Sequence, residues 1–142
     1  MKVKQYLQQL RKLDIIINQK IEERETLRAS LTSVASPDLS NERVQGGDPP
    51  GDARFVKTIA RVIDFEKEID DAIDSFVDKK HLIINQIQNL SKAAHIELLY
   101  KRYVEYKRLE VISVEMNYTY QYTKEMHGYA LQEFERTYPN LP

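Results

Sequence analysis

The sequence contains no cysteine and no tryptophan, and only four of its 142 residues are glycine. The absence of cysteine excludes disulfides, thiolate nucleophiles and thiolate metal sites. No apolar run reaches the roughly 18 residues that a membrane-spanning helix needs, and the polar start of the chain lacks the apolar core of a signal peptide. We therefore expect a cytoplasmic protein with no membrane partner.

An excess of charge of one sign is also missing. The chain carries 21 Lys and Arg against 22 Asp and Glu, and residues 91–142 carry seven of each class. A protein that binds nucleic acid without sequence preference needs a strong basic excess, because its affinity comes from contacts with phosphates. The composition therefore weighs against that class of binder.

Two long stretches of the chain repeat apolar residues at alternating spacings of three and four. The first row consists of Val3, Tyr6, Leu10, Leu13, Ile17, Leu27, Leu31 and Val34, interrupted by Lys20 and Arg24. The second consists of Phe55, Ile59, Val62, Ile69, Ile73, Phe76, Ile83, Ile87 and Leu90, interrupted by Glu66 and Lys80. This 3.5-residue period keeps one stripe of a helix facing a partner helix. It predicts coiled-coil helices over about 2–34 and 53–90.

The segment between these helices, residues 35–52, holds three of the four glycines and three of the five prolines. We expect a flexible loop there, because helix interiors do not tolerate this composition. Folding the helices antiparallel across it, with facing residue numbers adding up to 86, gives a coiled-coil helical hairpin. This register places Lys20 opposite Glu66, and we predict that their ion pair fixes it.

The second helix carries a further apolar row beside its seam. Its members are Val56, Ile63, Val77 and Ile84, with Asp70 interrupting. One partner helix cannot cover so wide a surface. We expect a second copy of the hairpin to pack there and form a four-helix bundle, which makes residues 1–90 an oligomerisation domain. Docking of the C-terminal module onto this face is the alternative.

An enzymatic function finds little support in the chain. The acidic run over residues 70–74 is similar to a magnesium site, but the heptad directs most of these carboxylates away from the partner helix, whereas a metal cage needs them to converge. The three histidines, His81, His95 and His127, show no ligand spacing. We predict a non-enzymatic protein without a cofactor or a metal site.

Residues 91–142 carry the pattern of three shorter helices. Ser91 is placed as the N-cap of a helix that runs from 92 to about 103, and a second helix follows over about 109–116. Residues 117–119 break the pattern, with Asn suited to a left-handed turn and Thr119 to the next N-cap. A third helix over about 120–135 would bury Thr123, Met126, Ala130 and Phe134. A short helix, a tight turn and a longer helix predict a helix-turn-helix module.

The stretches 99–105, 109–120 and 127–134 resemble region 4 of bacterial sigma factors. Nearly the whole chain resembles a small phage family from Gram-positive hosts that is grouped with ArpU-like and RinA-like regulators of late phage genes. The resemblance implies an all-α protein that regulates transcription in a phage or prophage. It would bind the double-stranded DNA of a promoter or operator beside host RNA polymerase.

Carrying the sigma-like module over by position identifies the residues expected at DNA. Those facing base edges are Tyr120, Gln121, Lys124 and Glu125, with His127 near the DNA backbone. Those expected at phosphates are Lys101, Arg102, Lys107 and Arg108. The recognition helix departs from the family pattern in its one lysine where several arginines are usual, and in Thr123 where a larger aliphatic residue is usual.

The sequence leaves three functions open. The leading one is a homo-oligomeric DNA-binding regulator whose paired modules read two half-sites about 34 Å apart or a multiple of it. The second is a protein-interaction module that keeps the sigma-like shape but binds polymerase or a phage protein, which the neutral charge of residues 91–142 suits. The third is a phage packaging component of the small-terminase type.

Overall fold

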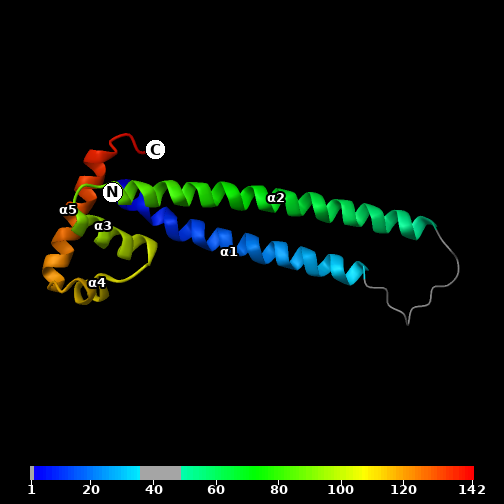
Figure 1. Ribbon diagram of the computed structural model, residues 1–142, viewed down its shortest axis with the longest axis horizontal. Coiled ribbons are helices and arrows are strands. Elements are labelled where there is room, and N and C mark those ends of the chain that lie inside the picture. The colour runs from blue at the N-terminus through cyan, green and yellow to red at the C-terminus, as the bar shows by residue number, and fades with distance from the viewer. Residues whose placement is uncertain (1, 36–48) are drawn as a thin grey trace. The chain divides into compact units, whose positions relative to one another are not determined.

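The computed structural model describes residues 2–35 and 49–142, with side chains described for 2–31 and 53–142. All regular secondary structure in this part of the chain is helical, as the sequence predicts. The elements are α1 (Lys2–Ala35), α2 (Pro49–Gln88), α3 (Ala93–Leu99), the π-helical segment η1 (Tyr100–Val104), α4 (Leu109–Met116) and α5 (Tyr120–Thr137). Figure 1 shows their order along the chain.

The two long helices begin and end close to their predicted bounds, with one difference. Helix α2 begins at Pro49, so residues 49–52 are helical and do not belong to the predicted loop. Proline is tolerated in the first turn of a helix, because the N–H groups there have no intrahelical partner. Most of the predicted loop 35–52 lies outside the described residues.

The predicted seams are the buried faces of α1 and α2. All nine seam positions from Val3 to Leu31, counting Lys20 and Arg24, are buried or half-buried. The ten seam positions of α2 from Phe55 to Ile87, counting Glu66 and Lys80, are likewise buried or half-buried, and so is Leu90 just after the end of α2. The heptad therefore identified correctly which face of each helix is turned inward.

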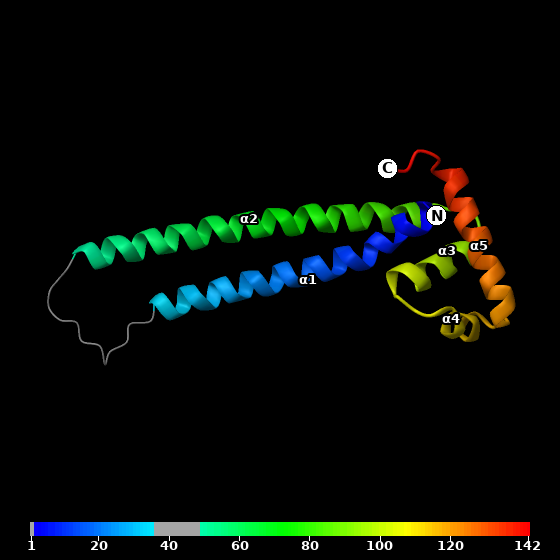
Figure 2. The ribbon, with the colours of Figure 1, turned by 180° about the vertical axis from the view of Figure 1, so that it is seen from behind.

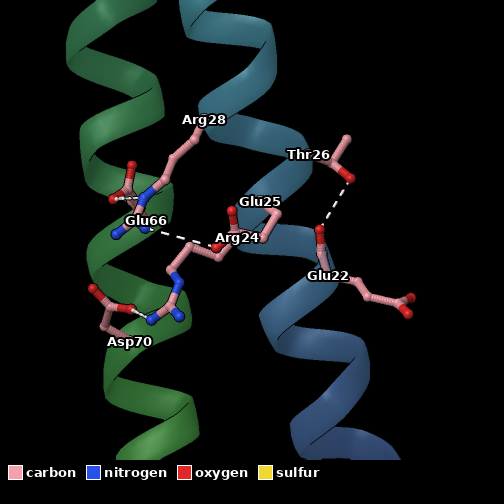
Figure 3. Close-up of polar contacts among 7 residues, drawn as sticks. All are labelled: Glu22, Arg24, Glu25, Thr26, Arg28, Glu66 and Asp70. Atoms are coloured by element: carbon pink, nitrogen blue, oxygen red, sulfur yellow. Dashed lines mark hydrogen bonds and ion pairs between the residues drawn. The ribbon is translucent and has the colours of Figure 1, made fainter.

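The chain divides into two compact units, residues 16–76 and residues 1–15 with 77–142. In the unit 16–76, helices α1 and α2 lie side by side and run in opposite directions (Figure 2). Two ion pairs join them: Arg24 donates to Asp70 at 2.8 Å, and Arg28 donates to Glu66 at 2.9 Å. Figure 3 shows both arginines of α1 reaching the carboxylates of α2.

These pairs correct the predicted register of the two helices. In both of them the residue numbers add up to 94, not 86, which shifts one helix along the other by about 12 Å at 1.5 Å per residue. The predicted Lys20–Glu66 ion pair is wrong, because Glu66 pairs with Arg28, and Lys20 lies 3.3 Å from Glu23 on its own helix. A seam that repeats every heptad looks similar after a shift of about one heptad, so its pattern alone could not exclude this register.

The unit formed by residues 1–15 and 77–142 has its own apolar core. Its buried apolar residues are Val3, Tyr6, Leu7, Leu10, Leu13, Ile83, Ile87, Leu90, Leu98, Leu99, Tyr103, Ile112, Met126, Ala130, Leu131, Phe134 and Leu141. The aromatic rings of Tyr6 and Phe134 lie 6.0 Å apart, and the Tyr138 hydroxyl donates to the Gln86 carbonyl at 2.9 Å. Contacts of this unit therefore cross the domain boundary that the sequence predicts at residue 90.

The start of α3 differs from its prediction. Lys92, not Ser91, occupies the N-cap position, and no side chain caps the helix. Ser91 instead donates from both its backbone N–H and its hydroxyl to Glu133 of α5, at 2.8 and 2.7 Å. The sequence predicts one helix over 92–103. The structure has the short α-helix α3 there, which continues as the π-helical segment η1.

Candidate nucleic-acid interface

A short turn connects α4 to α5 and sets the direction of α5. Asn117 adopts the left-handed conformation, with φ of 61° and ψ of 41°, and the N–H of Tyr118 donates to the Ser113 carbonyl at 2.9 Å. This pattern ends a helix with its last carbonyls satisfied. Thr119 then caps α5, because its hydroxyl accepts from the backbone N–H of Tyr122 at 3.1 Å. The sequence predicted both of these residue roles correctly.

The inward face of α5 also agrees with its prediction. Thr123, Met126, Ala130 and Phe134 are all buried. Thr123 is fully buried, and its hydroxyl donates to the Thr119 carbonyl at 2.9 Å. A buried hydroxyl with a hydrogen-bond acceptor carries little penalty, which explains how threonine fits in this buried position.

The four residues predicted at base edges lie together on the exposed N-terminal half of α5. Tyr120 is 46% exposed, and the Lys124 ammonium lies 5.1 Å from the centre of its ring. Gln121 donates to Glu125 at 3.3 Å. These are neighbour contacts between positions four apart on one helix, so the side chains can exchange them for contacts with a ligand at small cost.

Two of the residues predicted to contact phosphates, Lys101 and Lys107, form ion pairs with a carboxylate of the protein itself. Glu115 accepts from Lys101 at 2.8 Å and from Lys107 at 2.9 Å, and these hydrogen bonds lower the pKa of the Glu115 carboxyl. Arg102 donates to the Lys107 carbonyl at 3.0 Å, whereas Arg108 is exposed at the N-cap position of α4. The structure thus brings the lysines together, but it sets them around an anionic centre that offsets their charge.

His127 is half-buried and already forms a hydrogen bond with another residue of the protein. Its Nε2 atom forms a hydrogen bond of 2.8 Å with the Tyr103 hydroxyl, and the two rings stack with centres 5.7 Å apart. Burial, together with the nearby charges of Arg102 and Lys4, lowers the pKa of His127 to about 4. His127 is therefore neutral near pH 7 and brings no positive charge to a phosphate.

A buried polar cluster around Glu133 was not predicted. Besides the two hydrogen bonds from Ser91, Glu133 accepts one from Nδ1 of His95 at 2.6 Å. Burial raises the pKa of the Glu133 carboxyl, but these hydrogen bonds outweigh it and lower the pKa to about 2. The cluster ties the start of α3 to α5. Periodicity could have placed position 133 on the buried side of α5, but it could not reveal the partners.

Comparison with protein-family models, with curated proteins and with solved structures found no match. The resemblance to sigma region 4 and to the phage regulators therefore stays a prediction. Within the described residues, no helix has the length and apolar composition to cross a membrane. In the same part of the chain, no group of three or more His, Asp or Glu residues could hold a metal ion.

The surface of α4 and of the first turn of α5 is rich in exposed apolar and aromatic side chains. Val114 is 76% exposed, and the rings of Tyr118 and Tyr122 meet edge to face with centres 4.9 Å apart. Val111 and Tyr120 are exposed as well, and Tyr129 is exposed further along α5. Tyrosine offers a flat apolar ring and a hydroxyl, so this surface suits contact with thymine methyl groups and phosphates or with another protein.

Proposed function

We propose that this protein is a cytoplasmic, non-enzymatic regulator of transcription, of phage or prophage origin, that binds double-stranded DNA. In this proposal α4, the turn over residues 117–119 and α5 form a sigma region 4-like helix-turn-helix. Helix α5 enters the major groove and presents Tyr120, Gln121 and Lys124 to base edges. Helices α1 and α2 form an antiparallel coiled-coil hairpin through which the protein self-associates.

The observation that carries the proposal is the turn between α4 and α5. A left-handed Asn117 followed by the capping Thr119 leaves only three residues between the two helices. Such a turn fixes α5 relative to α4, as a helix-turn-helix requires. At the same time Tyr120, Gln121, Lys124 and Glu125 stay exposed at the N-terminal end of α5, where a recognition helix contacts bases.

The roles within the proposed site follow from side-chain chemistry. Gln121 can form a bidentate pair with adenine, in which it donates to N7 and accepts from the N6 amino group. Lys124 can donate to the O6 and N7 acceptors of guanine. Arg108, which is exposed, is the best placed of the four predicted phosphate contacts. Lys101 and Lys107 can contact phosphates only if they give up their ion pairs with Glu115, so we expect a modest affinity for DNA.

Self-association is supported by apolar side chains that α1 and α2 leave uncovered. Val56 is 63% exposed, Ile63 is 56% exposed and Val77 is 44% exposed, whereas Ile84 is half-buried. The first two lie one heptad apart on α2, as the contact face for another helix requires. A second copy would bring two helix-turn-helix modules into one assembly that reads paired half-sites.

A titration with duplex DNA tests the proposal. The DNA upstream of the gene for this protein is labelled, and a scrambled duplex of the same composition serves as the control. We expect preferential binding to the upstream DNA. Gln121→Ala and Lys124→Ala should each remove most of the preference, at about 1–3 kcal/mol per lost base contact. Gln132→Ala, an exposed change further along α5, should leave it unchanged. Equal affinity of the wild-type protein for both duplexes would contradict the proposal.

A second function is favoured by the apolar surface of α4 and α5. Val114 is the most exposed large apolar side chain in the described residues, and Glu115 neutralises two of the predicted phosphate contacts. An apolar surface with balanced charge is typical of a protein-binding site, such as one for RNA polymerase or a phage protein. Under this alternative Val114→Ser would weaken binding to the protein partner, and duplex DNA would not compete.

A further inference from the structure

One pocket outside the proposed recognition helix combines cationic and aromatic walls. It measures about 280 Å³ and is lined by Gln8, Arg11, Arg102, Tyr103 and Tyr106. Two of its five lining residues are arginines, and they are far apart in the sequence. Helix α1 supplies Arg11, and the π-helical segment η1 supplies Arg102.

Neither arginine of this pocket forms an ion pair with a carboxylate among the described residues. Arg11 lies over the Tyr106 ring, 5.9 Å from its centre, and Arg102 donates to the Lys107 carbonyl and interacts with the Tyr103 side chain. The nearby Asp14 is engaged by Lys80 and by the Tyr106 hydroxyl. A guanidinium has five N–H donors, so both arginines keep donors for a ligand.

The backbone that builds the pocket departs from regular helix at two points. Segment η1 is π-helical, with the N–H of Glu105 donating to the Tyr100 carbonyl at 3.1 Å. Tyr106 follows with φ of 59°, in the left-handed region that bulky residues rarely adopt. Its hydroxyl donates to the Asp14 carboxylate and lies 3.3 Å from the Leu10 carbonyl, and these contacts hold the ring against α1. Short π-helical segments and strained residues both concentrate at functional sites.

The electrostatics of the pocket select for an anion. Besides burial, the charges of Arg102 and Lys4 lower the pKa of His127, which lies next to the pocket residue Tyr103. Two guanidinium groups match the oxygen geometry and the double charge of a phosphate better than the single charge of a carboxylate. We propose that the pocket of Arg11, Arg102 and Tyr106 is a binding site for a phosphate group. This site does not depend on DNA binding by α5.

Inorganic phosphate is the probe for the first test. Thermal unfolding of the full chain is followed as phosphate replaces chloride at constant ionic strength. The wild-type protein should be stabilised in a saturable manner. Arg11→Gln should need about tenfold more phosphate for the same shift, because a charged hydrogen bond is lost. Arg136→Gln, an exposed change at the end of α5, is the matched control and should behave as the wild type.

Arg102→Gln should weaken phosphate binding as well, but it also removes the hydrogen bond to the Lys107 carbonyl and can destabilise the fold. Arg11 is exposed and makes no such bond, so the Arg11→Gln variant decides the result. Phosphate also stabilises proteins without binding, by exclusion from their surface. Equal stabilisation of the wild type and the Arg11→Gln variant, or no saturable effect at all, would overturn the proposal.

The source of the phosphate is distinguished by competition. If a short duplex displaces inorganic phosphate from the wild-type protein, the site binds a phosphodiester of the DNA backbone. If the duplex leaves phosphate binding unchanged, the site serves a small phosphorylated ligand. Both results support the site, and they assign it to different ligands of the same chemistry.

Discussion

The carboxylate of Glu133 accepts three hydrogen bonds, two from Ser91 and one from His95, in a place that water barely reaches. An ionised carboxylate is an acceptor only, so the Nδ1 atom of His95 must be the donor. We expect Glu133→Gln to lower the free energy of unfolding by about 2 kcal/mol at pH 7, because the amide NH2 turns a donor toward donors. Urea denaturation measures the change, with the exposed Glu135→Gln as its control.

Glu133 should also make the stability of the folded protein depend on pH in the acidic range. The pKa of Glu133 is lowered in the folded state, to about 2. Its contribution to stability is therefore fully present above the ordinary carboxyl pKa of about 4.5 and is lost as the pH falls toward 2. Between pH 5 and pH 3 the wild type should lose more unfolding free energy than the Glu133→Gln variant. Parallel pH profiles for both proteins would show that the cluster does not stabilise the fold.

At the scale of elements, the turn between α4 and α5 depends on the left-handed backbone of Asn117. Asparagine and glycine adopt this conformation readily, whereas a β-branched side chain clashes with the following carbonyl. We expect Asn117→Gly to be nearly neutral and Asn117→Val to cost about 1–2 kcal/mol of unfolding free energy. Thermal denaturation of the two variants measures the difference. A tolerated valine would contradict the turn.

The register of α1 against α2 is testable through its ion pairs. Arg24→Glu should lower the free energy of unfolding by about 1 kcal/mol, because it sets two carboxylates against each other at Asp70. The double exchange Arg24→Glu with Asp70→Arg should recover most of that loss, as measured by a double-mutant cycle. Exchanging Lys20 and Glu66 in the same way is the control. A larger coupling for that second pair would favour the register with residue numbers that add up to 86.

The helices of this protein were predictable because their signals are local and repeated. A heptad identifies the buried face of α1 and α2, and the cap and turn residues mark where α5 begins. The register was not predictable, since the seam charge of Arg24 and the exposed charge of Arg28 do not show which carboxylates of α2 they face. Likewise, the left-handed Tyr106 has hydrogen-bond partners on α1, more than 90 positions away, and nothing in the local sequence marks it or the π-helical segment η1 before it.

In the candidate site as well, features set by the local sequence were predictable, and contacts between residues distant in the sequence were not. The exposure of Tyr120 and Lys124 followed from the helical period, and so did the burial of Thr123. The neutralisation of Lys101 and Lys107 by Glu115 joins residues 14 and 8 positions apart, and no periodicity connects them. His127 was placed on the correct helix, but its pairing with Tyr103 depends on how η1 packs.

For the whole molecule, the proposed assembly predicts that α2 carries a contact between copies. Ile63→Glu should raise the dissociation constant about tenfold for each isoleucine that the assembly buries, because a charge replaces an apolar contact. Sedimentation equilibrium measures the association. Thr58→Glu introduces the same charge on another face of α2 and should have little effect. A wild-type protein that stays monomeric at high concentration would contradict self-association.

Binding of duplex DNA by α5 is tested most directly by the dependence of the affinity on salt. The affinity of the full chain for its upstream duplex is measured between 50 and 200 mM salt. Because binding to phosphates releases counterions, log K should fall linearly with log salt, by about 0.9 for each phosphate contacted. Arg108→Gln should reduce this slope by about one phosphate. Binding that does not change with salt, or no binding at low salt, would contradict the claim and favour a protein partner.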